Sequence, residues 1–114
     1  PDTVVLSTTD ELPTALTLFA QGDATVPAAN FGDGLRCVSG NLKRLYVKHA
    51  SGGQASAPGA GDLSVSAQSA ALGDPIPSGA TRYYFAYYRD PNAGFCPGPT
   101  GGTFNASNAF SIVW

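Results

Sequence analysis

The sequence contains no methionine, not even at its first position, and it has only one histidine. A chain that starts without methionine is not a direct translation product. We therefore expect that an N-terminal segment has been removed, most simply a secretion signal. This interpretation places the protein outside the cell or at the cell surface.

Charge is also scarce, because charged residues make up 12% of the chain, against roughly 25% in ordinary globular domains. The net charge is −2, and nucleic-acid binding would need a basic stripe. The one basic cluster, Lys43, Arg44 and Lys48, lies in a strand-like run and is interpreted as a solvated strand face. A surface with so little net charge repels copies of itself weakly, which favours self-association.

Long apolar runs are absent as well. The longest candidate, residues 15–20, is the size of a strand and falls far short of the ~18 residues that span a membrane. We therefore expect no membrane span. We also expect no nucleic-acid partner.

Catalytic motifs are missing too. His49 is the only histidine and Glu11 the only glutamate. No serine stands in a nucleophile-elbow pattern, and no cluster of ligands has the spacing of a metal site. The sequence therefore predicts a protein that is not an enzyme and that holds no metal and no cofactor.

Two cysteines are present, Cys37 and Cys96. In an exported chain the default expectation for such a pair is a disulfide, and the alternative is two reduced thiols. Closing a loop of this length would contribute roughly 4 kcal/mol in the loop-entropy description.

Nine prolines and fourteen glycines interrupt the chain, which leaves room for short strands but not for a long helix. Apolar residues alternate in several of the intervals, most clearly over 81–89, where Tyr83, Phe85 and Tyr87 fall on one face. The expected strands are 3–7, 14–21, 35–38, 42–49, 63–67, 81–89 and 103–114.

Three further intervals carry particular expectations. Residues 39–41 are predicted to close a hairpin between the strands at 35–38 and 42–49, because Gly and Asn accept a positive φ. Residues 24–30 are interpreted as a loop or an edge strand interrupted by Pro27. Residues 50–61, rich in small residues, are expected to form a long surface loop.

Together these patterns predict an all-β fold, an antiparallel β-sandwich of immunoglobulin-like type, with a jelly roll as the alternative. Residues 14–114 would form one domain. Residues 1–13 would form an N-terminal arm or a first strand.

Four segments resemble a family of secreted β-rich domains of environmental bacteria. They are FGDGLRCVSGNLKRLYVK at 31–48, SAALGDPIPSGATRYY at 69–84, YYRDPNAGFC at 87–96 and FNASNAFSIVW at 104–114. The resemblance covers roughly three-quarters of the chain. It implies export and a β-rich domain with these two cysteines, and it implies no particular activity or functional residue.

The N-terminal arm carries a β-prone core followed by a polar stretch. Such an arm can add a strand to the sheet of a neighbouring molecule, and a head-to-tail contact that does not close produces a filament. The alternative is an ordinary first strand that pairs within its own domain. The residues of this candidate interface strand are Thr3, Val4, Val5, Leu6, Ser7 and Thr8.

The functional hypothesis from the sequence is therefore an extracellular structural subunit that binds copies of itself. The alternative is a carbohydrate-binding or adhesion module that uses an exposed platform of Tyr46, Tyr84 and Tyr88; these tyrosines would otherwise be buried. Surface glycans would then be the partner. Asn105 begins an Asn-Ala-Ser triplet, a candidate glycosylation site.

Overall fold

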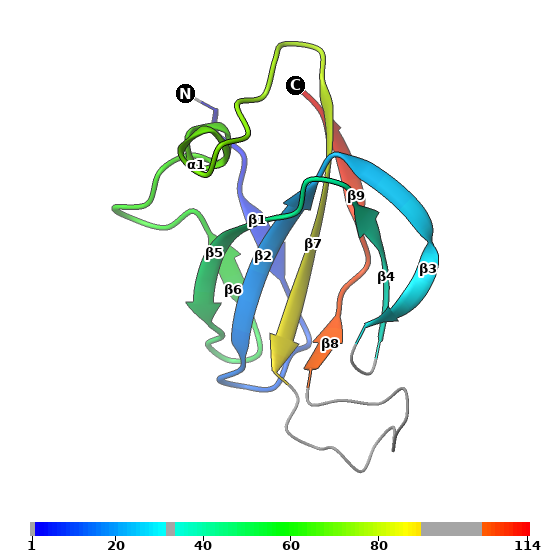
Figure 1. Cartoon of the computed structure of the whole chain (residues 1–114). Coiled ribbons are helices and arrows are strands. Elements are labelled where there is room, and N and C mark those ends of the chain that lie inside the picture. Colours follow the sequence, from blue (N-terminus) through cyan, green and yellow to red (C-terminus); the bar gives the residue numbers. More distant parts are fainter. Residues whose placement is uncertain (1, 32–33, 90–103) are drawn as a thin grey trace.

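The computed structural model describes residues 2–31, 34–89 and 104–114 of the chain (Figure 1). These residues form antiparallel strands and one short helix. The elements are β1 (Leu6–Thr8), β2 (Leu16–Gly22), β3 (Ala24–Phe31), β4 (Gly34–Ser39), β5 (Lys43–His49), β6 (Ala55–Ala57), α1 (Val65–Ala71), β7 (Thr81–Arg89), β8 (Phe104–Ala106) and β9 (Phe110–Val113).

A five-stranded antiparallel sheet forms the centre of the molecule, in the order β5-β2-β7, with β8 and β9 both paired along the outer side of β7. β8 pairs with the end of β7 at Tyr87–Arg89, and β9 pairs with its beginning at Thr81–Tyr84. The expected strand at 103–114 is therefore two short strands. The described chain is mainly antiparallel β-structure, as the sequence predicts.

The longest strand, β7, has side chains packed on both of its faces, because successive residues of a strand point in opposite directions. Tyr84 and Ala86 belong to one cluster of buried residues, together with Phe19 of β2. Phe85 belongs to a second cluster, with Ala20 of β2. The predicted alternation of this strand is confirmed, and neither face of the sheet can be left open to water.

The β3–β4 pair covers the second face, which is the side toward the right of Figure 1. Val38 of β4 is fully buried there, and Phe31 of β3 packs against the same cluster of buried residues. β3 is an edge strand whose register shifts between Thr25 and Ala29. The shift brackets Pro27, which lacks the N–H that a regular ladder needs.

The predicted hairpin at 39–41 is wrong. β4 pairs with β3, and β5 pairs with β2, so the chain crosses from one sheet to another at this point. Gly40 does have a positive φ of 79°, and the Asn41 N–H donates to Asp23 Oδ1 at 2.8 Å. The turn chemistry was therefore recognised, but not the strands that it joins.

The first face is covered by β1, β6 and α1. β1 pairs antiparallel with β6, with Leu6 opposite Ala57, Ser7 opposite Ser56 and Thr8 opposite Ala55. Leu6, Ala55 and Ala57 are all buried in the first cluster. The N-terminal strand thus lies on its own domain, and part of the predicted surface loop at 50–61 is a strand.

The predicted strand at 63–67 is wrong, since these residues begin helix α1. Ser64 caps the helix, and its hydroxyl accepts a hydrogen bond from the Ala67 N–H at 3.4 Å. Val65 and Ser69 are buried one helical turn apart, whereas Leu63 is exposed. The alternation of apolar and polar residues over 63–67 therefore belongs to the N-cap and the first turn of a helix, not to a strand.

The packing of Leu6 gives a direct test of the N-terminal strand. Leu6 is 3% exposed and its neighbour Val5 is 60% exposed. Replacing Leu6 by Ala should lower the free energy of unfolding by about 2–5 kcal/mol, and Val5→Ala by at most about 0.5 kcal/mol. Urea denaturation of the two variants measures both values, and equal effects would show that β1 is not packed on the sheet.

Candidate functional site

A groove of about 420 Å³ lies between the N-terminal strand and the central sheet. The segment from Leu6 to Glu11 forms one wall. Side chains of β7, among them Ala86 and Tyr88, form the floor, and the link from β8 to β9 contributes Ser107 and Asn108. The groove exists because β1 and β6 cover only part of this face of the sheet.

The predicted tyrosine platform is wrong. Tyr84 is 1% exposed and Tyr46 is 6% exposed, so neither ring can present a flat face to a sugar. The Tyr46 hydroxyl donates to the Leu63 carbonyl at 2.8 Å. Tyr88 alone is partly exposed, and it lines the groove.

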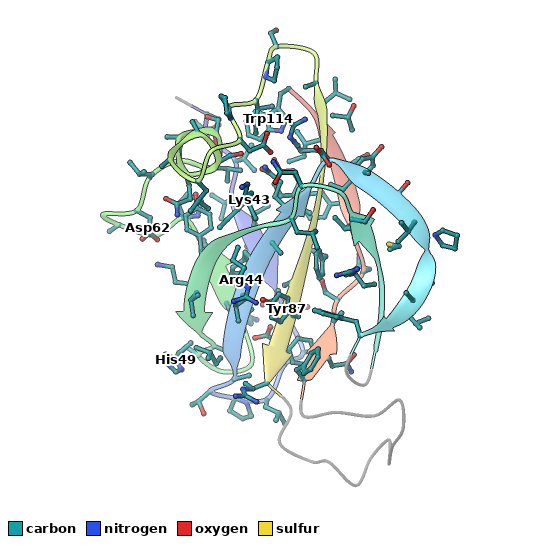
Figure 2. All side chains as sticks on the ribbon, in the orientation of Figure 1. Lys43, Arg44, His49, Asp62, Tyr87 and Trp114 are labelled. Atoms are coloured by element: carbon teal, nitrogen blue, oxygen red, sulfur yellow. The ribbon has the colours of Figure 1, made fainter. Side chains whose placement is uncertain are left out.

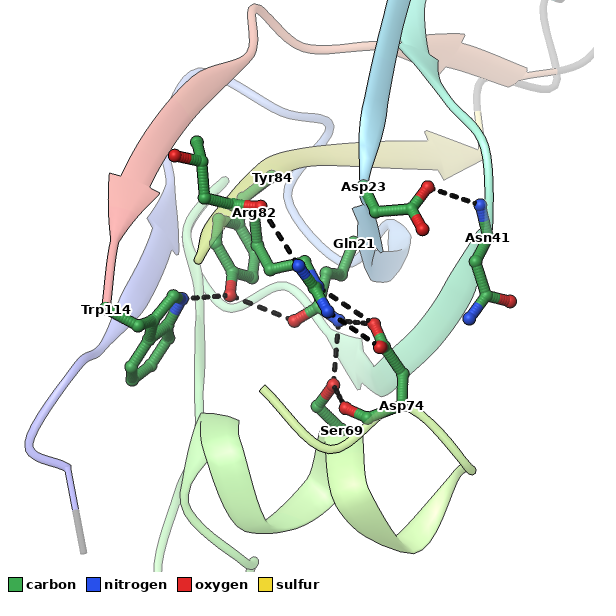
Figure 3. Close-up of polar contacts among 9 residues, drawn as sticks. Gln21, Asp23, Asn41, Ser69, Asp74, Arg82, Tyr84 and Trp114 are labelled. Carbon is green, nitrogen blue, oxygen red and sulfur yellow. Dashed lines mark hydrogen bonds and ion pairs between the residues drawn. The ribbon is translucent and has the colours of Figure 1, made fainter. Parts of the chain in front are cut away.

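A connected group of buried polar side chains joins the helix to the sheet (Figure 3). Gln21 of β2 donates from Nε2 to Ser69 Oγ at 2.7 Å and to Asp74 Oδ2 at 2.9 Å. The Ser69 hydroxyl in turn donates to the Asp74 carbonyl at 2.6 Å. Gln21 and Ser69 are fully buried.

The same group extends along β7 to the C-terminal residue. Arg82 holds the Asp74 carboxylate with two hydrogen bonds, from Nε at 3.0 Å and from Nη2 at 2.8 Å. Tyr84 donates to Gln21 Oε1 at 2.9 Å, and Trp114 Nε1 donates to the Tyr84 hydroxyl at 3.0 Å. These hydrogen bonds to Asp74 raise the pKa of the Arg82 guanidinium.

Every polar side-chain atom that is buried in this group has a partner, so the group fastens α1, β2 and β7 together and offers no free reactive atom. Sequence reasoning missed it. Its members are 48 to 63 residues apart at the Gln21 contacts, and no local pattern links them.

The predicted disulfide is not seen. Cys37 of β4 is an exposed, free cysteine, and Cys96 lies outside the described residues. The pairing therefore stays a prediction. Asn105 lies partly buried in β8, and its side-chain oxygen accepts from the Ala106 N–H at 2.8 Å; glycosylation there also stays a prediction.

His49 is exposed at the end of β5, away from Asp62 and Trp114 (Figure 2). Over residues 2–31, 34–89 and 104–114, no three His, Cys, Asp or Glu side chains are grouped so as to hold a metal ion. No helix in the described part of the chain is long and apolar enough to cross a membrane.

A second hollow, of about 370 Å³, lies on the other side of β7. Phe31, Tyr87 and Phe104 line it with their rings, and Arg44 lies at its edge. The three rings contact one another edge to face, with centroids 5.0 to 6.4 Å apart. The aromatic cluster therefore packs β3 against β7 and β8 of the central sheet.

Comparison with protein-family models, with curated proteins and with solved structures finds no significant match to this chain. The family resemblance of the sequence motifs consequently stays a prediction, and the function must be argued from the geometry.

Breaking the Asp74–Arg82 pair should be strongly destabilising. Removing one partner of a buried pair leaves the other charge unpaired, which costs about 3–5 kcal/mol. We expect Asp74→Ala to lower the free energy of unfolding by about that much. The matched control is Asp62→Ala, which breaks the exposed Lys48–Asp62 pair and should have a far smaller effect in the same urea titrations. Equal losses would contradict the structural role of Asp74.

The buried tyrosines predict loss of stability at alkaline pH. Burial raises the pKa of Tyr84 to about 12 and that of Tyr46 to about 12, above the ~10 of an unfolded chain. The folded state therefore keeps these protons longer, and the stability they support is intact below pH ~10 and falls as the pH rises toward 12. In urea titrations at pH 9, 10 and 11, Tyr84→Phe should show a smaller decline than the parent chain. An unchanged decline would contradict the assignment.

Proposed function

We propose that this protein is an extracellular structural subunit, without enzymatic activity, that assembles by exchanging its N-terminal strand with a neighbouring copy. The arm of one molecule would lie on the domain of the next in the position that β1 takes on its own domain. When each molecule gives its arm to one neighbour and receives the arm of a different one, the contact is head-to-tail, and it builds a filament if it does not close into a ring.

The observation that carries this proposal is the place of β1 outside the central sheet. β1 pairs only with β6, over three residue pairs. Among the large side chains of the arm, only Leu6 is buried in the first core cluster, with Val4 packed against it. Such a small and self-contained contact can be made by the same residues of another copy without any change in the rest of the fold.

The connection between the arm and β2 supports exchange at a defined hinge. Asp10 has φ = 62°, the only positive φ of a residue other than glycine among the described residues. Left-handed backbone is unfavourable for residues with a side chain, although Asp tolerates it better than most. Residues beyond the hinge are fixed, since the Glu11 N–H donates to the Gly53 carbonyl at 3.0 Å. An extended arm would release Asp10 and leave this anchor in place.

The start of the arm adds specificity. The Asp2 carboxylate accepts hydrogen bonds from the Ser66 N–H, at 2.8 Å, and from the Ser66 hydroxyl, at the first turn of α1. Burial pushes the pKa of Asp2 up, but the hydrogen bonds from Ser66 and Val4 outweigh it, and the pKa lies below its usual value. A neighbour's arm would be held by the same charge-assisted contacts at one end and by Leu6 at the other.

The surface is consistent with such packing. The outer strand β3 carries no charged side chain, and Val26 and Leu35 are exposed on the β3–β4 pair. Within the same proposal, the sheets form an immunoglobulin-like β-sandwich, and the Cys37–Cys96 disulfide braces each subunit outside the cell. A glycan-binding role loses its main support because Tyr46 and Tyr84 are buried.

Cross-linking tests the exchange directly. Ser7 and Ser56 are exposed, lie opposite each other in the β1–β6 register, and have hydroxyls 3.1 Å apart; cysteines at such a position meet the geometry of a disulfide. In the double variant Ser7→Cys/Ser56→Cys, oxidation at high protein concentration should join different chains. A ladder of covalent multimers on non-reducing gels is the expected result.

The two single variants are the matched controls. All variants also carry Cys37→Ser and Cys96→Ser, so each control has one thiol and can form at most a disulfide-linked dimer, not a ladder. Asp10→Gly should also shorten the ladder, since glycine removes the cost of left-handed backbone in the closed form. If the double variant gives only internally cross-linked monomers at every concentration, the arm is not exchanged and the proposal fails.

A further inference from the structure

Glu11, one of the residues that line the groove beside the N-terminal strand, has a buried carboxylate oxygen that lacks a partner among the described residues. Glu11 is 9% exposed and lines the groove. Its Oε2 accepts a hydrogen bond from the Thr17 hydroxyl at 2.8 Å. Its Oε1 has no hydrogen-bond partner among the described residues.

An unpaired buried carboxylate oxygen is unfavourable, because the charged group has lost water and gained no donor in exchange. The other carboxylate oxygen, Oε2, is already held by Thr17, and the backbone of Glu11 is held by its hydrogen bond to the Gly53 carbonyl. The site is therefore built around an acceptor that needs a donor from outside the described residues.

The charges around the groove decide which donor fits. Two carboxylates, Asp10 and Glu11, line it, and no Lys, Arg or His in the part of the chain that the structure describes does so. An anionic ligand would be repelled, whereas a cation would be attracted and could lose its water beside Glu11. The rings of Phe19, Tyr88 and Phe110 also line the groove, and aromatic faces attract cations.

We propose that this groove binds a protonated primary amine carried on a short aliphatic chain. The ammonium group donates to Glu11 Oε1, and the methylene groups lie against the aromatic side chains of the floor. The groove has the volume of an ordinary small-ligand pocket, which begins at roughly 300 Å³. The site is the same whether residues 6–9 come from its own chain or from a neighbour, so it does not depend on the proposed function.

The experiment is a titration with 1,5-diaminopentane at pH 7 and constant ionic strength, followed by amide chemical shifts of the full chain at a dilution where it is monomeric. The neutral control ligand is 1,5-pentanediol, which has the same chain length. We expect saturable shifts at residues 8–11 and 107–110 with the diamine and none with the diol.

Glu11→Gln keeps an oxygen for Thr17 and removes the charge, so it should weaken diamine binding at least about tenfold. The matched control, Asp23→Asn, neutralises a carboxylate outside the groove and should leave binding unchanged. Should the Gln variant fail to fold, Asn108→Lys puts a cation at the exposed rim without touching the core, and it should abolish binding.

Two results would overturn the proposal. Equal binding of diamine and diol would show that charge plays no part. Binding of a neutral sugar such as glucose that survives Glu11→Gln would assign the groove to polyols instead. Cross-linking of the arm is measured separately, so a failure here leaves the strand-exchange result untouched, and the reverse also holds.

Discussion

The structure depends on one constraint, which is that the central strand β7 has apolar rings on both faces and must be covered twice. Tyr84 and Ala86 need one cover, and Phe85 needs another. The β3–β4 pair supplies the second, with Phe31 set against Phe85 and Tyr87 at ring distances of 6.0 and 5.2 Å. The first is assembled from three small pieces: β1 near the start of the chain, and β6 and α1 from residues 55–71.

The composite cover explains the other features of the molecule. Pieces this small cannot hold themselves in place, and the buried group of Gln21, Asp74 and Arg82 fastens the helix to the sheet through charge-assisted hydrogen bonds. Among the described residues, the N-terminal piece is held by the hydrogen bonds of Asp2, by its pairing with β6 and by the burial of Leu6. The proposed strand exchange involves this piece, and the groove lies beside it.

Sequence alone predicted the strands where one local signal was strong and nothing competed with it. β7 was clear because nine residues alternate without a Gly or Pro. The predicted hairpin at 39–41 was wrong because turn residues determine how the chain changes direction but not which strand pairs with the strand that follows. The prediction for residues 63–67 was wrong because Leu63, Val65 and Ala67 alternate with polar residues as in a strand. The helix is instead determined by the Ser64 cap and by a distant hydrogen bond from Gln68 Nε2 to the Leu45 carbonyl.

The candidate site was less accessible still. The arm was predicted from its composition, but the groove depends on how far β1 covers the sheet, and Glu11 was noted only as the single glutamate of the chain. The tyrosines were misplaced because a period-two pattern shows which rings share a face and not whether another layer covers that face. Tyr46 and Tyr84 are buried by residues that lie many positions away in the chain.

The most direct test of the account is the molar mass of the chain lacking residues 1–9, measured by light scattering with and without a peptide of residues 2–9. If the N-terminal strand is exchanged between copies, the full chain forms open-ended multimers, while the shortened chain stays a monomer and binds one peptide. Multimers of the shortened chain as large as those of the full chain would contradict it.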